Sequence, residues 1–211
     1  MFDKFKIFKD NWEEIRDEVL SNGLDIFQNN PNCECTWGVA PNGVPVSLGF
    51  MLCIGNEPLE EHIKLFPKTW KLYNELDIPS KQSIGFGLLQ PRGVIDIHAD
   101  PEDCYRYHIC LQSENNKANI YGTKYRNTKT DLYINESEEI MLDPGLMEHG
   151  AINKSSKIVR IHLAIDYLSE EKSIERYNKG VGVASDWLNF KFPDKAKGCK
   201  CKHSIWEENN V

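Results

Sequence analysis

Three side chains of the types that hold iron occur in two short stretches of the sequence. His98 and Asp100 are separated by one small residue in IDIHAD, and His149 follows in EHG. In a His-x-Asp arrangement the imidazole and the carboxylate can both reach one ion, and a distant histidine completes a facial triad. Such a triad leaves positions open on Fe(II) for a cosubstrate and for oxygen. The residue types therefore predict a mononuclear Fe(II) centre held by His98, Asp100 and His149.

Two further stretches each carry an arginine followed two residues later by a histidine. Because side chains alternate along a strand, Arg106 shares a face with His108, and Arg160 shares a face with His162. Two such strands form a basic wall that can hold a dicarboxylate by charge-assisted hydrogen bonds. The dicarboxylate that a mononuclear Fe(II) site most often uses is 2-oxoglutarate, which reacts there with O2. Asp166, on the same face as Arg160, is the alternative partner for that guanidinium.

Strand-like runs separated by short turns follow one another after residue 80. They lie at 83–90, 93–98, 105–112, 118–121, 131–134, 139–142 and 158–166. Many closely spaced strands favour an antiparallel sandwich or barrel. Proline and glycine just before His149 indicate a tight turn at that histidine, and the charged segment 124–130 is expected to cover a pocket mouth as a loop.

The first 80 residues have helical patterning. In the segment 4–27, apolar residues at spacings of three and four predict an amphipathic helix. Asn22, which precedes a glycine, is the predicted end of this helix. Residues 57–76 are expected to form a second helix, on which His62 is a packing or surface residue rather than a ligand. We expect such helices to pack against the outside of the sheet.

Four motifs in this order resemble the aspartyl/asparaginyl β-hydroxylase family of Fe(II)/2-oxoglutarate-dependent oxygenases. They are the His98-x-Asp100 pair, YRYHICL with Arg106, EHGAINK with His149 and VRIHLAID with Arg160, from about residue 80 to residue 168. The resemblance implies a mainly β fold with flanking helices, a double-stranded β-helix of the jelly-roll or cupin-like kind. It also implies that the two motif histidines bind iron.

The resemblance also implies roles for the basic residues. Arg160 would bind the far carboxylate of 2-oxoglutarate, and Arg106 and His108 would contact this cosubstrate from the other side. Strand alternation, rather than the resemblance, singles out His162, which is expected either to line the cosubstrate pocket or to fill the barrel. The best-known animal members lack the acid of the triad, whereas Asp100 is present here, as in bacterial members. Where the animal enzyme has a serine near the far carboxylate, the segment 84–89 has a glycine.

Length and composition limit the remaining classes. The 211 residues suggest a single domain, with a helical region at 1–80, a β-helix core at 81–168 and a tail at 169–211. Four aromatic residues are expected to anchor the tail, which begins with a helix at 169–177: Trp187, Phe190, Phe192 and Trp206. A net charge of −7 and the lack of a basic stripe argue against a nucleic-acid partner. No apolar run suits a membrane or a signal peptide, so we expect no membrane partner and a cytoplasmic location.

Seven cysteines in such a chain are expected to be reduced, and an odd number cannot pair completely. Cys53, Cys104 and Cys110 are expected in the core or a pocket wall. Two closer pairs offer four thiolates to a structural zinc ion, although unpaired thiols are the favoured interpretation: Cys33 with Cys35, and Cys199 with Cys201.

The sequence therefore predicts an Fe(II)/2-oxoglutarate-dependent dioxygenase, a hydroxylase acting on an amino acid or on an Asp/Asn-type residue of a peptide or protein. Two alternatives stay open. One is a cupin-like metalloenzyme that does not use 2-oxoglutarate, and the other is a non-catalytic jelly-roll binding module. The interval of eleven residues between His149 and Arg160 disfavours the first alternative, and the complete triad disfavours the second.

Overall fold

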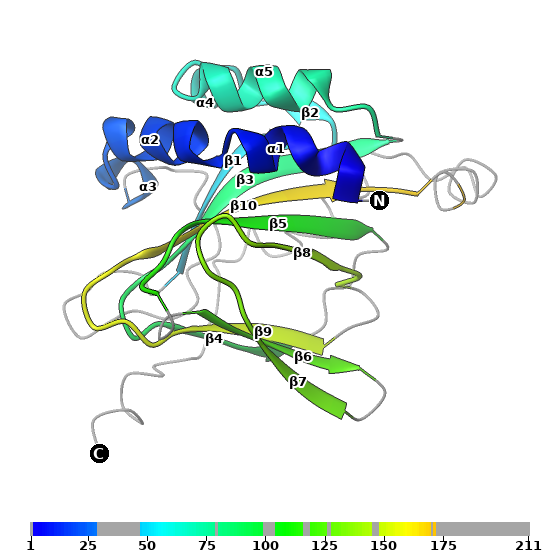
Figure 1. The fold of residues 1–211 in the computed structure, drawn as a ribbon. Helices are drawn as coiled ribbons and strands as arrows, with labels where there is room; N and C mark the ends of the chain where they lie inside the picture. The colour runs from blue at the N-terminus through cyan, green and yellow to red at the C-terminus, as the bar shows by residue number, and fades with distance from the viewer. Residues whose placement is uncertain are drawn as a thin grey trace, which may run out of the picture.

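The computed structural model describes residues 2–28, 47–78, 80–98, 104–115, 119–125, 128–144, 148–169 and 171. Its strands are β1 (Ser47–Ile54), β2 (Glu57–Pro58), β3 (Lys81–Leu89), β4 (Val94–His98), β5 (Tyr105–Gln112), β6 (Asn119–Tyr125), β7 (Thr128–Tyr133), β8 (Glu139–Leu142), β9 (Glu148–Asn153) and β10 (Arg160–Tyr167). Within the described residues they form a six-stranded sheet, β2-β1-β3-β10-β5-β8, and a four-stranded sheet, β4-β9-β6-β7. The two sheets lie one above the other (Figure 1).

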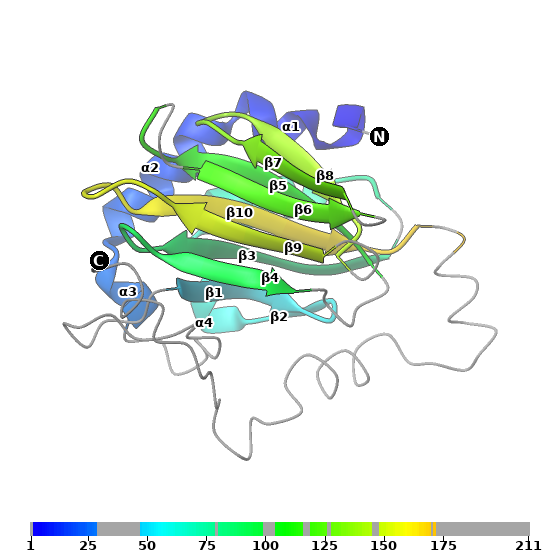
Figure 2. The ribbon, with the colours of Figure 1, turned by 90° about the horizontal axis from the view of Figure 1, so that it is seen from below.

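The chain from β3 to β10 winds back and forth between the two sheets. β3, β5, β8 and β10 belong to the larger sheet, and β4, β6, β7 and β9 belong to the smaller one. The last strand, β10, lies between β3 and β5, and it pairs with both in antiparallel register. Figure 2 shows the smaller sheet in front of the larger one. This winding is that of a double-stranded β-helix, so the predicted fold class is confirmed.

Helices cover the outer face of the larger sheet (Figure 1). They are η1 (Phe2–Phe5), α1 (Lys6–Asp10), α2 (Trp12–Asn22), α3 (Asp25–Gln28), α4 (Glu60–Ile63) and α5 (Pro67–Glu75). The ring of Phe5 stacks on that of Tyr107 in β5, with 4.2 Å between the ring centroids. Glu18 links α2 to α5. Its carboxylate accepts hydrogen bonds from the backbone amides of Lys68 and Thr69 in α5, at 2.8 and 3.0 Å.

The larger sheet has one apolar face and one polar face because side chains alternate along its strands. Its outward side chains join the helices in the main core: Ile84, Phe86, Leu88, Tyr107, Ile109, Leu111, Ile161, Leu163, Ile165 and Tyr167. A smaller apolar cluster lies on the inward side: Leu89, Cys110, Ile134, Leu142 and Ala151. The alternation therefore directs Arg106, His108, Arg160 and His162 into the space between the sheets.

The single helix predicted over 4–27 is interrupted. α1 ends at Asp10 and α2 begins at Trp12. Between them the side-chain amide of Asn11 donates to the carbonyl of Ile7 at 2.7 Å, which offers the backbone an alternative to helical bonding. The predicted end at Asn22 is confirmed, and Gly23 follows with φ of 76°.

The second predicted helix, 57–76, is wrong at its first residues and is not continuous. Residues 57–58 form β2, and the helical part is divided into α4 and α5. Pro67 begins α5, since proline suits a first helical position but cannot continue a preceding helix. His62 is a packing residue, as predicted. Its Nδ1 lies 2.6 Å from the carbonyl of Met51, and its ring lies 4.4 Å from that of Phe50.

Two loop predictions in the β region are wrong. The segment 124–130 was expected to be a loop, but residues 124–125 end β6 and residues 128–130 begin β7, which pair as a hairpin. His149 was expected on a tight turn, but it lies in β9, with β4 on one side and β6 on the other. Pairing on both sides outweighs the helix- and strand-breaking tendency of the neighbouring glycine.

Several sequence predictions lie outside the described residues. They concern Asp100, the helix at 169–177, the four tail anchors and the cysteines at 33, 35, 199 and 201. The assignment of 1–211 to a single domain stays a prediction. Cys53, Cys104 and Cys110 are buried, as predicted, and burial raises the pKa of Cys53 and of Cys110 to about 11. None of the helices in the described part of the chain is long and apolar enough to cross a membrane.

Candidate metal and anion site

The two predicted histidine ligands are cross-strand partners in the smaller sheet. His98, the last residue of β4, is paired with His149 of β9. The register shifts between Ile95 and His98, so that β4 has one residue more than β9 over this interval. Directly opposed residues in an antiparallel pair have Cβ atoms about 4.5–5.5 Å apart on one face of the sheet. A bulge next to His98 is the kind of irregularity that re-aims a side chain beside a functional site.

His149 is buried, with 3% of its surface exposed. The side chain of His98 and all of Asp100 lie outside the described residues, so the third predicted ligand has no described position. Among side chains that the structure does describe, no three of the metal-binding types form a cluster. The fit to a metal therefore depends on the pairing of His98 with His149.

Two more histidines occupy the inner face of the larger sheet. His108 of β5 and His162 of β10 are buried, and their ring centroids are 5.8 Å apart. Burial holds the pKa of His108 well below its usual value, and Arg106 and Arg160 lower it further. Burial and then Arg160 do the same to the pKa of His162. Both imidazoles are therefore neutral at pH 7.

The histidines of the two sheets are close enough to interact. His149 of the smaller sheet is among the charges that lower the pKa of His108 in the larger sheet. The winding of the chain thus brings residues from β5 and β9, which are far apart in sequence, to one region between the sheets.

Arg160 begins β10, and its guanidinium lies against His162. Its Nε and Nη2 atoms are each 2.9 Å from a ring nitrogen of that histidine. A neutral imidazole has only one acceptor nitrogen, so at most one of these contacts is a hydrogen bond. Arg160 is only 5% exposed, which places a buried positive charge at this end of the inner face.

Two paired glycines lie on the inner face beside this arginine and histidine. Gly87 of β3 is paired with His162 on one side and with Gly49 of β1 on the other. A Cβ atom built on either glycine would have no heavy atom of the described residues within 4 Å. Gly87, one of the two glycines in the segment 84–89, therefore lies next to His162.

Arg106 makes a two-pronged ion pair with Asp166. Its Nε lies 2.6 Å from Oδ1 and its Nη2 lies 3.1 Å from Oδ2. The hydroxyl of Ser83 also donates to Oδ2 of Asp166, at 2.8 Å. Asp166 as the alternative partner of Arg160 is wrong, because six residues along a strand span about 20 Å. Asp166 and Arg160 lie at opposite ends of β10.

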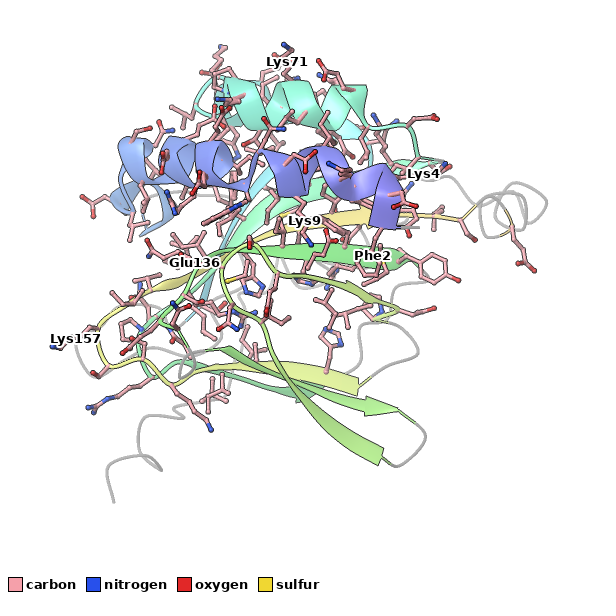
Figure 3. The ribbon with its side chains drawn as sticks, viewed as in Figure 1. Phe2, Lys4, Lys9, Lys71, Glu136 and Lys157 are labelled. Atoms are coloured by element: carbon pink, nitrogen blue, oxygen red, sulfur yellow. The ribbon has the colours of Figure 1, made fainter. Side chains whose placement is uncertain are left out.

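The two arginines thus flank the two histidines on the inner face. Both Arg106 and Arg160 act on the pKa of His108, so both guanidinium groups are within electrostatic range of it. By contrast, Lys71 on α5 and Lys157 after β9 are exposed and point away from the space between the sheets (Figure 3). A buried guanidinium such as that of Arg160 can hold an anion between the sheets.

Sequence reasoning missed Ser83 and the pairing of Arg106 with Asp166. Alternation along β10 had placed Asp166 on the inner face with Arg160. Only the register, which sets Asp166 opposite Arg106 on one side and Ser83 on the other, identifies its partners.

The model of the aspartyl/asparaginyl beta-hydroxylase family matches residues 9–170 of the sequence. No curated protein is similar enough in sequence to be counted as a relative. Similar solved structures include an oxalate oxidase, with a TM-score of 0.42, 14% identity and coverage of 71% of this chain and 64% of that one. Another is a recombinant oxalate oxidase in complex with glycolate, with a TM-score of 0.41, 12% identity and coverage of 62% and 56%.

A predicted oxalate decarboxylase from Thermotoga maritima is also similar, with a TM-score of 0.33, 13% identity and coverage of 48% of this chain and 74% of that one. The chain spans less than two thirds of the length of the oxalate oxidase chains that it matches.

Proposed function

Since the chain belongs to the aspartyl/asparaginyl β-hydroxylase family, we propose that it is an Fe(II)- and 2-oxoglutarate-dependent oxygenase. The proposed reaction is hydroxylation of an amino acid, or of an aspartyl- or asparaginyl-type residue in a peptide or protein. The observation that carries the proposal is the cross-strand pairing of His98 with His149 inside a double-stranded β-helix. Arg160 completes the argument, because it supplies a buried cation eleven residues after His149.

In this proposal His98, Asp100 and His149 hold the metal. The donor set of two imidazoles and a carboxylate fits Fe(II) and leaves positions open for exchangeable ligands. The burial of His149 supports a site from which bulk water is largely excluded. When bound, the iron would supply oxidation of a C–H bond by O2, coupled to decarboxylation of 2-oxoglutarate to succinate.

The chain's own residues would bind and orient the diacid. Arg160 would hold the far carboxylate, which is the task for which a buried guanidinium is suited. His162, neutral and next to Arg160, would line the same pocket, and Gly87 and Gly49 would leave it room. Arg106 and His108 would contact the diacid from the other side.

The neutral state of His108 and His162 has a chemical consequence. A neutral imidazole carries one N–H donor and no charge. It can therefore orient an oxygen of the diacid by a hydrogen bond without adding a positive charge to the site. In this arrangement Asp166 already compensates the charge of Arg106. Arg160 is therefore the cation proposed to select an anionic cosubstrate.

The substrate and the surroundings are proposed in broader terms. We propose a small-molecule, peptide or protein substrate, with neither nucleic acid nor membrane as a partner. The cytoplasm is the proposed location, because an odd number of cysteines, seven, suits a reducing compartment.

The decisive experiment is an anaerobic titration of the protein with Fe(II) and then 2-oxoglutarate, followed by admission of O2. We expect a visible absorption band that needs both additions, and succinate formation that candidate substrates accelerate. A protein that binds Fe(II) but shows neither a band nor succinate would favour a cupin-like metalloenzyme that does not use 2-oxoglutarate. A protein that binds no metal at all would overturn the proposal.

A further inference from the structure

The proposed chemistry uses Arg106 but gives no role to Asp166, its partner in a buried ion pair between the sheets. Asp166 is 4% exposed and Arg106 is 12% exposed at their side chains. Ser83, Asp166 and Arg106 lie directly opposite one another on the adjacent strands β3, β10 and β5. The three side chains therefore form one row across the inner face of the larger sheet.

The geometry of the row fixes the guanidinium of Arg106 in place. Two parallel contacts, from Nε and from Nη2, determine both the position and the plane of the group. The hydroxyl of Ser83 holds one oxygen of the carboxylate in turn, at 2.8 Å.

The row lies next to the histidines of the site. His108 is two residues from Arg106 on the same face of β5, and its pKa is lowered by Arg106 and raised by Asp166. The same imidazole is also affected by His149. The ion pair is thus part of the electrostatic environment of the proposed metal and anion site, and it is not an isolated pair on the surface.

A purely structural role explains the pair less well. Removing two charges from water costs about as much as their attraction returns, so a buried ion pair is weak evidence for stability. The three strands are already joined by their backbone hydrogen bonds. A two-pronged contact that orients a charged group has a clearer use where that group must meet a ligand.

We infer that Asp166, supported by Ser83, is a positioning residue that presents Arg106 to the anion bound between the sheets. This inference rests on the proposed function, in which that anion is 2-oxoglutarate. Asp166 does not touch the anion itself. It acts through Arg106, by fixing the direction of the guanidinium.

The test measures the dissociation constant of 2-oxoglutarate from the Mn(II)-loaded protein and, on the same samples, the thermal unfolding temperature. We expect Asp166→Asn to weaken binding by about tenfold or more, the usual effect of losing a group that orients a binding residue. We expect Arg106→Gln to weaken binding at least as much. The double variant should bind no more weakly than Arg106→Gln alone, because the two residues act as one unit.

Asp10→Asn is the matched control, because it breaks an exposed ion pair with Lys6 on α1. It should leave the affinity for 2-oxoglutarate unchanged. A folded Asp166→Asn protein that binds 2-oxoglutarate as tightly as the wild type, but melts at a lower temperature, would show a structural role and overturn the inference.

Ser83→Ala keeps the test valid if Asp166→Asn does not fold. It keeps both charges and removes one hydrogen bond to Asp166, so we expect binding about twofold to tenfold weaker. Unchanged affinity in this variant also overturns the inference. If the wild-type protein does not bind 2-oxoglutarate, the proposed function is overturned, and this inference with it. If the wild-type protein binds 2-oxoglutarate and the variants bind it equally well, only this inference is overturned.

Discussion

His98 and His149 are opposed across the β4–β9 ladder, immediately after a bulge in β4. Fifty residues of chain that include four strands separate them in sequence, and the winding of the double-stranded β-helix brings them together. Pairing in an antiparallel ladder fixes the backbones of these two residues opposite one another. The two histidines of the proposed metal site therefore belong to one sheet.

Replacing one of these histidines should remove metal binding. We expect His149→Ala to abolish tight Fe(II) binding, together with the visible band that forms with 2-oxoglutarate, because the metal loses an imidazole from a buried site. Anaerobic titration with Fe(II) measures this. His62→Gln, which alters a packing histidine of α4, is the control and should bind iron normally. If His149→Ala binds iron as tightly as its parent, the assignment of the ligands is wrong.

Arg160→Ala should weaken 2-oxoglutarate binding without loss of the metal. The expected loss is about 2–5 kcal/mol, the usual magnitude when one partner of a buried charge pair is removed. Arg160→Lys should recover only part of it, since an ammonium group cannot make the planar two-pronged contact. The measurement is the dissociation constant of 2-oxoglutarate from metal-loaded protein. A stable, metal-loaded Arg160→Ala protein with undiminished affinity would contradict the role assigned to this residue.

Folding stability should decrease as the pH falls below about 6.5. Burial holds the pKa of His108 and of His162 below the value that they have in the unfolded chain. Below that unfolded value the unfolded chain binds more protons than the folded protein, so acid favours unfolding. Each such histidine can contribute a slope of up to about 1.4 kcal/mol per pH unit.

His162→Gln tests this origin of the pH dependence. The variant should lose less unfolding free energy between pH 7.5 and pH 5 than the wild type, as measured by denaturant titration at each pH. Equal losses in the two proteins would show that this histidine is not a source of the acid sensitivity.

Glu18→Ala should destabilise the protein without affecting the site. The carboxylate of Glu18 accepts hydrogen bonds from two amides in the first turn of α5 and from the hydroxyl of Thr69. Loss of a capping group at a helix N-terminus costs about 0.5–2 kcal/mol, which lowers the melting temperature of a chain of this size by a few degrees. Calorimetry measures the shift, and a changed affinity for 2-oxoglutarate would show that the helices influence the site.

The cysteine pairs near the chain ends are expected to bind no zinc. Metal analysis after iron removal should find no stoichiometric zinc, because single-residue spacing is less typical of zinc ligands than a spacing of two. About one zinc ion per chain, lost in a protein with Cys199→Ser and Cys201→Ser, would contradict this expectation.

The sequence by itself determined the faces of the central strands. In β5 the alternation of Arg106 and His108 with apolar residues predicted both the bounds of the strand and the side that faces the helices, and the structure has the same bounds. This succeeds because alternation is local: it depends on the backbone geometry of a single strand and on one buried apolar face.

The sequence was less informative where local preference and tertiary pairing disagree. Glycine and proline near His149 indicated a turn, but strands on both sides of β9 supply backbone partners that keep it extended. The charged segment at 124–130 is likewise held in a hairpin. Local propensity is a weak constraint when neighbouring strands satisfy the backbone.

Only the tertiary structure decided which charges are partners. From alternation alone, Asp166 was a possible partner for Arg160 on its own strand, but the register sets it against Arg106 and Ser83 instead. The pairing of strands that are about 60 residues apart is decided by the packing of the whole barrel, since slipping a strand by one residue would turn every side chain to the opposite face. Residue types and spacing therefore determined the chemistry that is available to this protein, and the strand register determined that Asp166 compensates Arg106 while Arg160 remains beside a neutral histidine.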